Sequence, residues 1–98
     1  MHTWEIKKQM TTETIIIKVL YFGIVQEIFG LSEKIYHLSS NATLQTLIDL
    51  HEDNAKFSKH ASFFRYAINQ KMVQDQRYID VDLQPQDCIA IIPPMSGG

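Results

Sequence analysis

The chain has 98 residues, of which 45% are apolar and 20% are charged, and its formal net charge is −2. This composition is typical of one globular domain with its own core and argues against a disordered chain. With no run of lysines and arginines, no signal-peptide pattern and no apolar run near the ~20 residues of a membrane span, we expect a cytoplasmic protein that binds neither nucleic acid nor membranes.

Residues 1–13 are polar and lack a clean period, so we expect a flexible N-terminal extension there. The strongest predicted strand covers 14–22, where β-branched and aromatic residues dominate. One face of this strand includes Lys18, which belongs near water, so we expect that face to be partly exposed. Its other members are Ile16, Leu20 and Phe22. The opposite face should enter the core, and it holds Ile15, Ile17, Val19 and Tyr21.

Two helices and a second strand are predicted next. Gly23 ends the first strand, and a short amphipathic helix should follow and stop at Gly30. Alternation over 33–38 predicts a strand antiparallel to the first. Thr43 is a suitable N-cap for the main helix, which we place near 43–52. The predicted buried face of this helix comprises Leu44, Leu47, Ile48 and His51. Residues 52–62 are expected to hold a turn or a second short helix.

The last third of the chain predicts three more strands, at 62–69, from Met72, and at 88–92, with a turn at Gln70 and Lys71. In the last strand Ile89 and Ile91 should face the core, while Cys88, Ala90 and Ile92 should point outward. One main helix crossing a mixed sheet of four or five strands indicates an α+β chain with a β-grasp fold. We therefore expect a single domain over 14–92.

Residues 93–98, Pro-Pro-Met-Ser-Gly-Gly, form what we call the C-terminal tail. The two prolines cannot continue a strand ladder, so the tail should project from the domain. Six extended residues reach about 20 Å. Gly97 and Gly98 are thin enough to carry a terminal carboxylate into a narrow site. A frayed terminus or a linker remnant is the alternative that the tail alone leaves open.

Three stretches resemble the small subunit of molybdopterin synthase, a ubiquitin-like sulfur carrier. They are residues 17–30, residues 67–70 and residues 83–98, the last with Asp87 before the strand and the Pro-Pro-x-Ser-Gly-Gly end after it. The resemblance covers about residues 14–98 in the family's order. Residues 1–13 depart from the family pattern, and so does Gln86, where the family usually has glycine.

The resemblance implies a ubiquitin-like β-grasp fold and a carrier role for Gly98. An adenylating enzyme of the ubiquitin-activating type would use ATP to turn the Gly98 carboxylate into an acyl adenylate. Sulfur from a persulfide would then give a thiocarboxylate. The tail would enter the large subunit of molybdopterin synthase and donate sulfur to a cyclic pyranopterin precursor. The chain would be a non-catalytic subunit of that sulfurtransferase and would bind no cofactor or metal itself, with ATP held by the activating partner.

A carrier must dock, and exposed apolar patches often mark interfaces. We predict such a patch beside the tail from the outward residues of the first and last strands. The alternative is that a helix or the N-terminal extension of this chain covers it. The predicted partner-binding residues are Leu20, Phe22, Ile92, Pro93, Pro94, Met95 and Ser96, next to Gly97 and Gly98 as the reactive end, and Ala90 belongs to the same patch.

The remaining polar candidates favour structural roles. Cys88 is interpreted as a small packing residue. The four histidines lack metal-ligand spacing, and Asp87 and the other aspartates near it are expected to cap turns. Three alternatives stay open at this point: a sulfur carrier of the thiamine pathway, a ubiquitin-like protein modifier, and a β-grasp interaction module with an inert tail.

Overall fold

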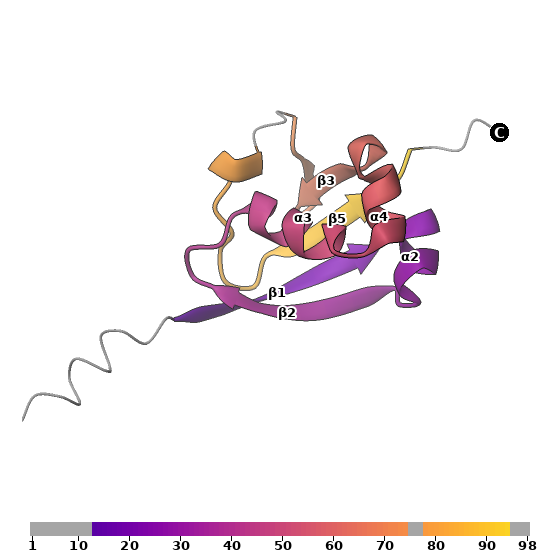
Figure 1. Cartoon of the computed structure of the whole chain (residues 1–98). Coiled ribbons are helices and arrows are strands. Elements are labelled where there is room, and N and C mark those ends of the chain that lie inside the picture. Colours follow the sequence, from indigo (N-terminus) through magenta and orange to yellow (C-terminus); the bar gives the residue numbers. More distant parts are fainter. Residues whose placement is uncertain (1–12, 75–77, 95–98) are drawn as a thin grey trace, which may run out of the picture.

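A five-stranded mixed sheet organises the computed structural model, which describes residues 13–74 and 78–94. The strand order is β2-β1-β5-β3-β4. The strands are β1 (Thr14–Tyr21), β2 (Glu33–Ser39), β3 (Arg65–Ile68), β4 (Lys71–Met72) and β5 (Cys88–Ile92). β1 pairs with β2 antiparallel and with β5 parallel, and β3 pairs antiparallel with both β5 and β4. The first and last strands therefore lie side by side in the middle of the sheet (Figure 1).

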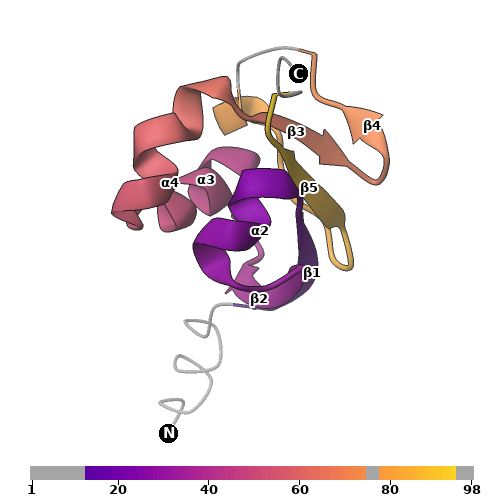
Figure 2. The same ribbon diagram turned by 90° about the vertical axis from the view of Figure 1, so that its right-hand side faces the viewer.

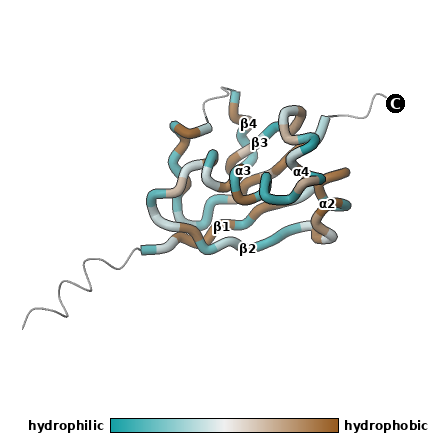
Figure 3. Tube along the Cα trace, viewed as in Figure 1, coloured by the Kyte–Doolittle hydropathy of each residue, from teal (hydrophilic) through white to brown (hydrophobic). Residues whose placement is uncertain are grey.

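The alternation of β1 decides which face of the sheet becomes the core. Ile15, Ile17, Val19 and Tyr21 are buried, as predicted, while the alternate residues are exposed or half-buried. Shifting the register by one residue would bury Lys18 and expose Ile15 and Ile17, so the alternation fixes the register. In Figure 3, apolar residues are brown along β1 and along α2 (Gly23–Phe29), the helix that follows it.

Three helices are capped by the residues that precede or follow them. α3 (Leu44–Glu52) begins with a capping box, in which the backbone N–H groups of Thr43 and Thr46 each donate to the other's hydroxyl. α4 (Ala55–His60) begins at Asn54, whose side-chain oxygen accepts from two backbone N–H groups. α2 (Gly23–Phe29) ends at Gly30, which has a φ of 70°. The predicted helix near 43–52 is confirmed.

The helices leave one face of the sheet bare. α3 and α4 cover one face, and α2 lies at the end where β1 and β5 finish (Figures 1 and 2). The buried side chains between the layers include Leu44, Leu47, Phe57, Ile89 and Ile91. No helix in the described part of the chain covers the other face, which we call the open face (Figure 2). No described helix is long and apolar enough to cross a membrane.

Two predicted boundaries were wrong. The third strand begins at Arg65 rather than at residue 62, because Ala61–Phe63 forms a 3-10 turn that continues α4, and the Phe64 N–H donates to the Ala61 carbonyl at 3.1 Å. The hairpin turn falls on Asn69 and Gln70, with φ of 51° and 73°, one residue earlier than predicted. β4 consequently starts at Lys71. A second 3-10 turn, Tyr78–Asp80, follows β4 in the chain.

Candidate functional site

The described chain ends at Pro94, just beyond the carboxyl end of β5 (Figure 1). Because β5 runs parallel to β1, this end lies beside the start of α2. Gly23 has a φ of 53°, and a Cβ at this position would lie 2.9 Å from Cγ of Pro93. The missing side chain of Gly23 thus leaves room for the Pro93 ring, which fixes where the chain leaves the sheet. Met95, Ser96, Gly97 and Gly98 lie outside the described residues.

The open face carries an apolar groove next to this point, where the sequence predicted an exposed apolar patch. The groove has a volume of about 570 Å³. The predicted patch residues lie together in its wall: Leu20, Phe22, Ala90 and Ile92. Phe22 remains 46% exposed. Exposed apolar surface of this kind is typical of an interface.

Several groove residues were not predicted. Ala67 lies directly across from Ala90 in the β3–β5 pair, and the two small side chains leave the floor of the groove hollow. Met72 and the turn residues Asn69 and Gln70 complete the rim. The alternation of Phe64, Tyr66 and Ile68 already placed Ala67 on the opposite face, and this was the signal that could have found it. Cys88 also lines the groove and is only partly buried, so its interpretation as a packing residue holds only in part.

Asp87 fixes the turn that leads into β5. Its carboxylate is buried and accepts from the Gln84 N–H at 2.8 Å and from the Asn69 side-chain amide at 2.9 Å. The Asn69 side-chain oxygen in turn accepts from the Cys88 N–H at 2.9 Å. These bonds tie the β3–β4 turn to the start of β5. The prediction that Asp87 caps a turn is confirmed.

A buried polar cluster lies on the helical side of the sheet, at the carboxyl end of β1. The Tyr21 hydroxyl is 2.8 Å from His51 Nε2, and the Tyr36 hydroxyl is 3.1 Å from the same atom. His51 Nδ1 lies 2.8 Å from the Leu47 carbonyl and donates to it, so Nε2 accepts. Burial lowers the pKa of His51 and raises the pKa of Tyr21. The cluster joins two strands to α3 and does not line the groove.

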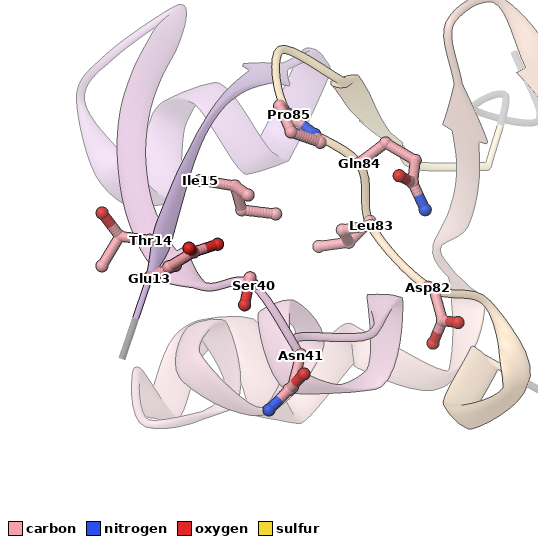
Figure 4. Close-up of a pocket in the computed structure, with 9 residues that line it drawn as sticks. All are labelled: Glu13, Thr14, Ile15, Ser40, Asn41, Asp82, Leu83, Gln84 and Pro85. Carbon is pink, nitrogen blue, oxygen red and sulfur yellow. The ribbon is translucent and has the colours of Figure 1, made fainter. Parts of the chain in front are cut away.

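The opposite end of the sheet holds a more polar hollow of about 370 Å³ (Figure 4). Glu13 and Asp82 stand on opposite sides of it, over the buried side chains of Ile15 and Leu83. It lies at the amino ends of β1 and β5 and shares no lining residue with the groove. Among residues 13–74 and 78–94, no three His, Cys, Asp or Glu side chains are grouped as metal ligands would be.

Sheet order, the helix across one face and a central last strand define a ubiquitin-like β-grasp protein. The model of the ThiS family matches residues 19–98, and the chain belongs to this family. It is 37% identical over 87 residues to the molybdopterin synthase sulfur carrier subunit of Chlamydomonas reinhardtii, covering 84% of this chain and 98% of the relative. The resemblance predicted from the sequence is confirmed.

Solved structures share the fold at low sequence identity. A Pyrococcus furiosus protein described as subunit 1 of molybdopterin converting factor has a TM-score of 0.70 and 22% identity, over 83% of this chain and 99% of that one. Small archaeal modifier protein 1 from Methanosarcina acetivorans gives 0.66 and 20%, over 87% and 98%. A chain in the complex of subunits 1 and 2 of molybdopterin-converting factor from Helicobacter pylori gives 0.61 and 19%, over 86% and 100%.

Proposed function

We propose that this chain is the sulfur carrier subunit of molybdopterin synthase, with the Gly98 carboxylate as the group that carries sulfur. An adenylating enzyme would use ATP to make the Gly98 acyl adenylate and release pyrophosphate. A persulfide sulfur would displace AMP, and a thiol would reduce the resulting acyl disulfide to the thiocarboxylate. The thiocarboxylate would then donate its sulfur to a cyclic pyranopterin precursor. Covalent carriage divides one difficult sulfur transfer into easier steps.

One structural observation carries this proposal. The central strand β5 ends at Ile92, which lines the apolar groove, and Pro93 and Pro94 follow directly after it. A partner that covers the groove would therefore also lie where the tail begins. The Chlamydomonas relative and the Helicobacter pylori complex support the large subunit of the synthase as that partner.

The described residues would position the tail, and the reacting groups other than Gly98 would belong to the partners. Phe22 and Ile92 offer apolar surface for docking close to Pro93 and Pro94, the last described residues. Pro93 packs against Gly23, so the tail starts in a defined direction. A tail of six residues can then reach about 20 Å into a partner's site.

Deletion of Gly98 tests the proposal. We expect it to abolish conversion of the pyranopterin precursor by the reconstituted synthase, after incubation with the adenylating enzyme, ATP and a sulfur donor. The thermal midpoint should stay the same, because the deletion removes none of the residues that form the sheet, the helices and their core. Gly97→Ala should reduce conversion, since its methyl group widens the tail in a narrow channel. A Gly98-deleted chain that still supports conversion would end the sulfur-carrier proposal.

Intact mass of the protein isolated from its host separates the alternatives. A thiocarboxylate raises the mass of the free acid by about 16 Da, the difference between sulfur and oxygen, and is expected for a carrier. Conversion of a thiazole precursor instead of the pyranopterin would identify a thiamine-pathway carrier. Isopeptide adducts on lysines would identify a protein modifier. An unmodified terminus, together with full function after removal of Gly97 and Gly98, would identify an interaction module.

A further inference from the structure

A third hollow lies between α2 and α4 and has a volume of about 300 Å³. Each helix contributes residues spaced three and four positions apart, so each presents one face to it. The lining consists of Ile24, Glu27 and Ile28 from α2 and of Lys56, Lys59 and His60 from α4. None of these residues lines the groove on the open face, and the proposed sulfur chemistry uses none of them.

The two walls of this hollow differ in chemistry. Apart from Glu27, the α2 wall is apolar, and its Ile24 is exposed. On the α4 wall, Lys56 and Lys59 are exposed, and His60 is half-buried and can take part in a further hydrogen bond. Among the described residues of the lining, two ammonium groups therefore stand against one carboxylate, beside exposed apolar surface.

The helix itself explains only part of this positive charge. Lys59 and His60 lie in the last turn of α4, where a positive charge interacts favourably with the helix dipole. Lys56 lies in the first turn, where a positive charge is unfavourable. The one ion pair within the described ranges joins Lys18 and Glu33 on the open face, so neither α4 lysine pairs with a carboxylate of the described chain.

We propose that this hollow docks an acidic segment of another protein, with an apolar side chain among its carboxylates. The apolar side chain would lie against Ile24, and the carboxylates would accept hydrogen bonds from Lys56 and Lys59. Glu27 would repel carboxylates from the α2 wall, which gives the segment one orientation. The site goes beyond sulfur carriage, so a chain without Gly98 should bind such a segment equally well.

The test is a titration of the full chain with the peptide acetyl-Glu-Asp-Leu-Glu-amide, followed by the backbone amide NMR signals of α2 and α4. We expect saturable shifts there and none with acetyl-Gln-Asn-Leu-Gln-amide, which has a similar shape but no charge. Acetyl-Glu-Asp-Ser-Glu-amide lacks the apolar side chain and should bind severalfold more weakly. Inorganic phosphate, the probe for a site that accepts any anion, should also bind more weakly than the first peptide.

Two double variants make the test decisive. Lys56→Gln combined with Lys59→Gln should weaken binding of the acidic peptide about fivefold, because two ion pairs are lost. Lys34→Gln combined with Lys71→Gln removes the same charge from exposed strand positions and should bind normally. All four lysines are exposed, so both double variants should remain folded.

Four results would overturn the proposal. The first is the absence of saturable shifts at α2 and α4 with the acidic peptide. The second is equally tight binding of the neutral peptide, the serine peptide or phosphate. The third is normal binding by the double variant of α4, and the fourth is an equal loss of binding in the two double variants.

Discussion

Gln86 holds a backbone conformation that an ordinary side chain disfavours. Its φ is 69°, in the left-handed region that suits glycine. The turn keeps this conformation because the Gln86 N–H donates to the Ile16 carbonyl at 2.7 Å and Asp87 accepts from Gln84. Gln86 is exposed, so its side chain adds little packing to compensate. The positive φ of Gln86 is therefore a local strain at the entry to β5.

Replacing this residue tests the strain directly. Gln86→Gly should raise the free energy of unfolding by roughly 0.5–1 kcal/mol, because the relief of the left-handed strain exceeds the extra entropy of an unfolded glycine. Gln84→Gly, two residues earlier and without a positive φ, should lower it. Urea denaturation of both variants measures the difference. Destabilisation by both glycines would show that Gln86 is not strained.

At the scale of elements, one histidine connects three of them. His51 of α3 contacts the hydroxyls of Tyr21 on β1 and Tyr36 on β2 while it donates to the Leu47 carbonyl. Its ring is 1% exposed and lies against the rings of Phe29 and Phe57. Burial is the main reason that the pKa of His51 falls below its usual 6.5, and the positive charge of Lys34 adds to the effect. The end of the sheet that carries the tail thus depends on a neutral imidazole.

This dependence predicts a loss of stability in mild acid. The unfolded chain binds a proton at His51 near pH 6.5, whereas the folded chain resists it, so the stability should be full above about pH 6.5 and fall as the pH drops toward the lowered folded pKa. The slope should approach about 1.4 kcal/mol per pH unit at most. Urea unfolding between pH 8 and pH 5, followed by circular dichroism, measures it.

His51→Phe provides the comparison, because it removes the titrating group and should flatten this part of the pH profile. His37→Gln, on the exposed side of β2, is the matched control and should keep the profile of the unchanged chain. Equal slopes for the unchanged chain and His51→Phe would show that other groups cause the acid sensitivity.

The elements differ in how much of them the sequence could predict. β1 and α3 were predicted because alternation and a Thr43 cap are local signals that their burial reinforces. The start of β3 was not, because Ser62 and Phe63 alternate like a strand while the hydrogen bond from Phe64 to Ala61 continues the preceding helix. An apolar patch was predicted from the two central strands, whereas Ala67 and Met72 join the groove only through the pairing of β3 with β5 and β4.

At the scale of the whole molecule, the sheet separates two chemically different surfaces. The open face offers an apolar groove beside the exit of the tail, and the helical side carries the hollow between α2 and α4 with its two lysines. The Tyr21–His51 cluster lines neither of them. One face can therefore dock a partner while the other remains accessible, and substitutions on the two faces should act independently.

Phe22 and Leu50 allow a matched test of which face docks the synthase. The two side chains are equally exposed, at 46% and 47%, but Phe22 lines the groove and Leu50 lies on α3. Phe22→Asp should weaken binding to the large subunit at least tenfold, because a carboxylate would lose its water in an apolar interface. Leu50→Asp should bind normally, and both variants should remain folded. Isothermal titration calorimetry with the large subunit measures the affinity, and circular dichroism checks the fold. Equal loss of binding by both variants would indicate a general effect of the added charge. Unfolding of Phe22→Asp would show that Phe22 belongs to the core. Normal binding by Phe22→Asp would place the docking surface outside the groove.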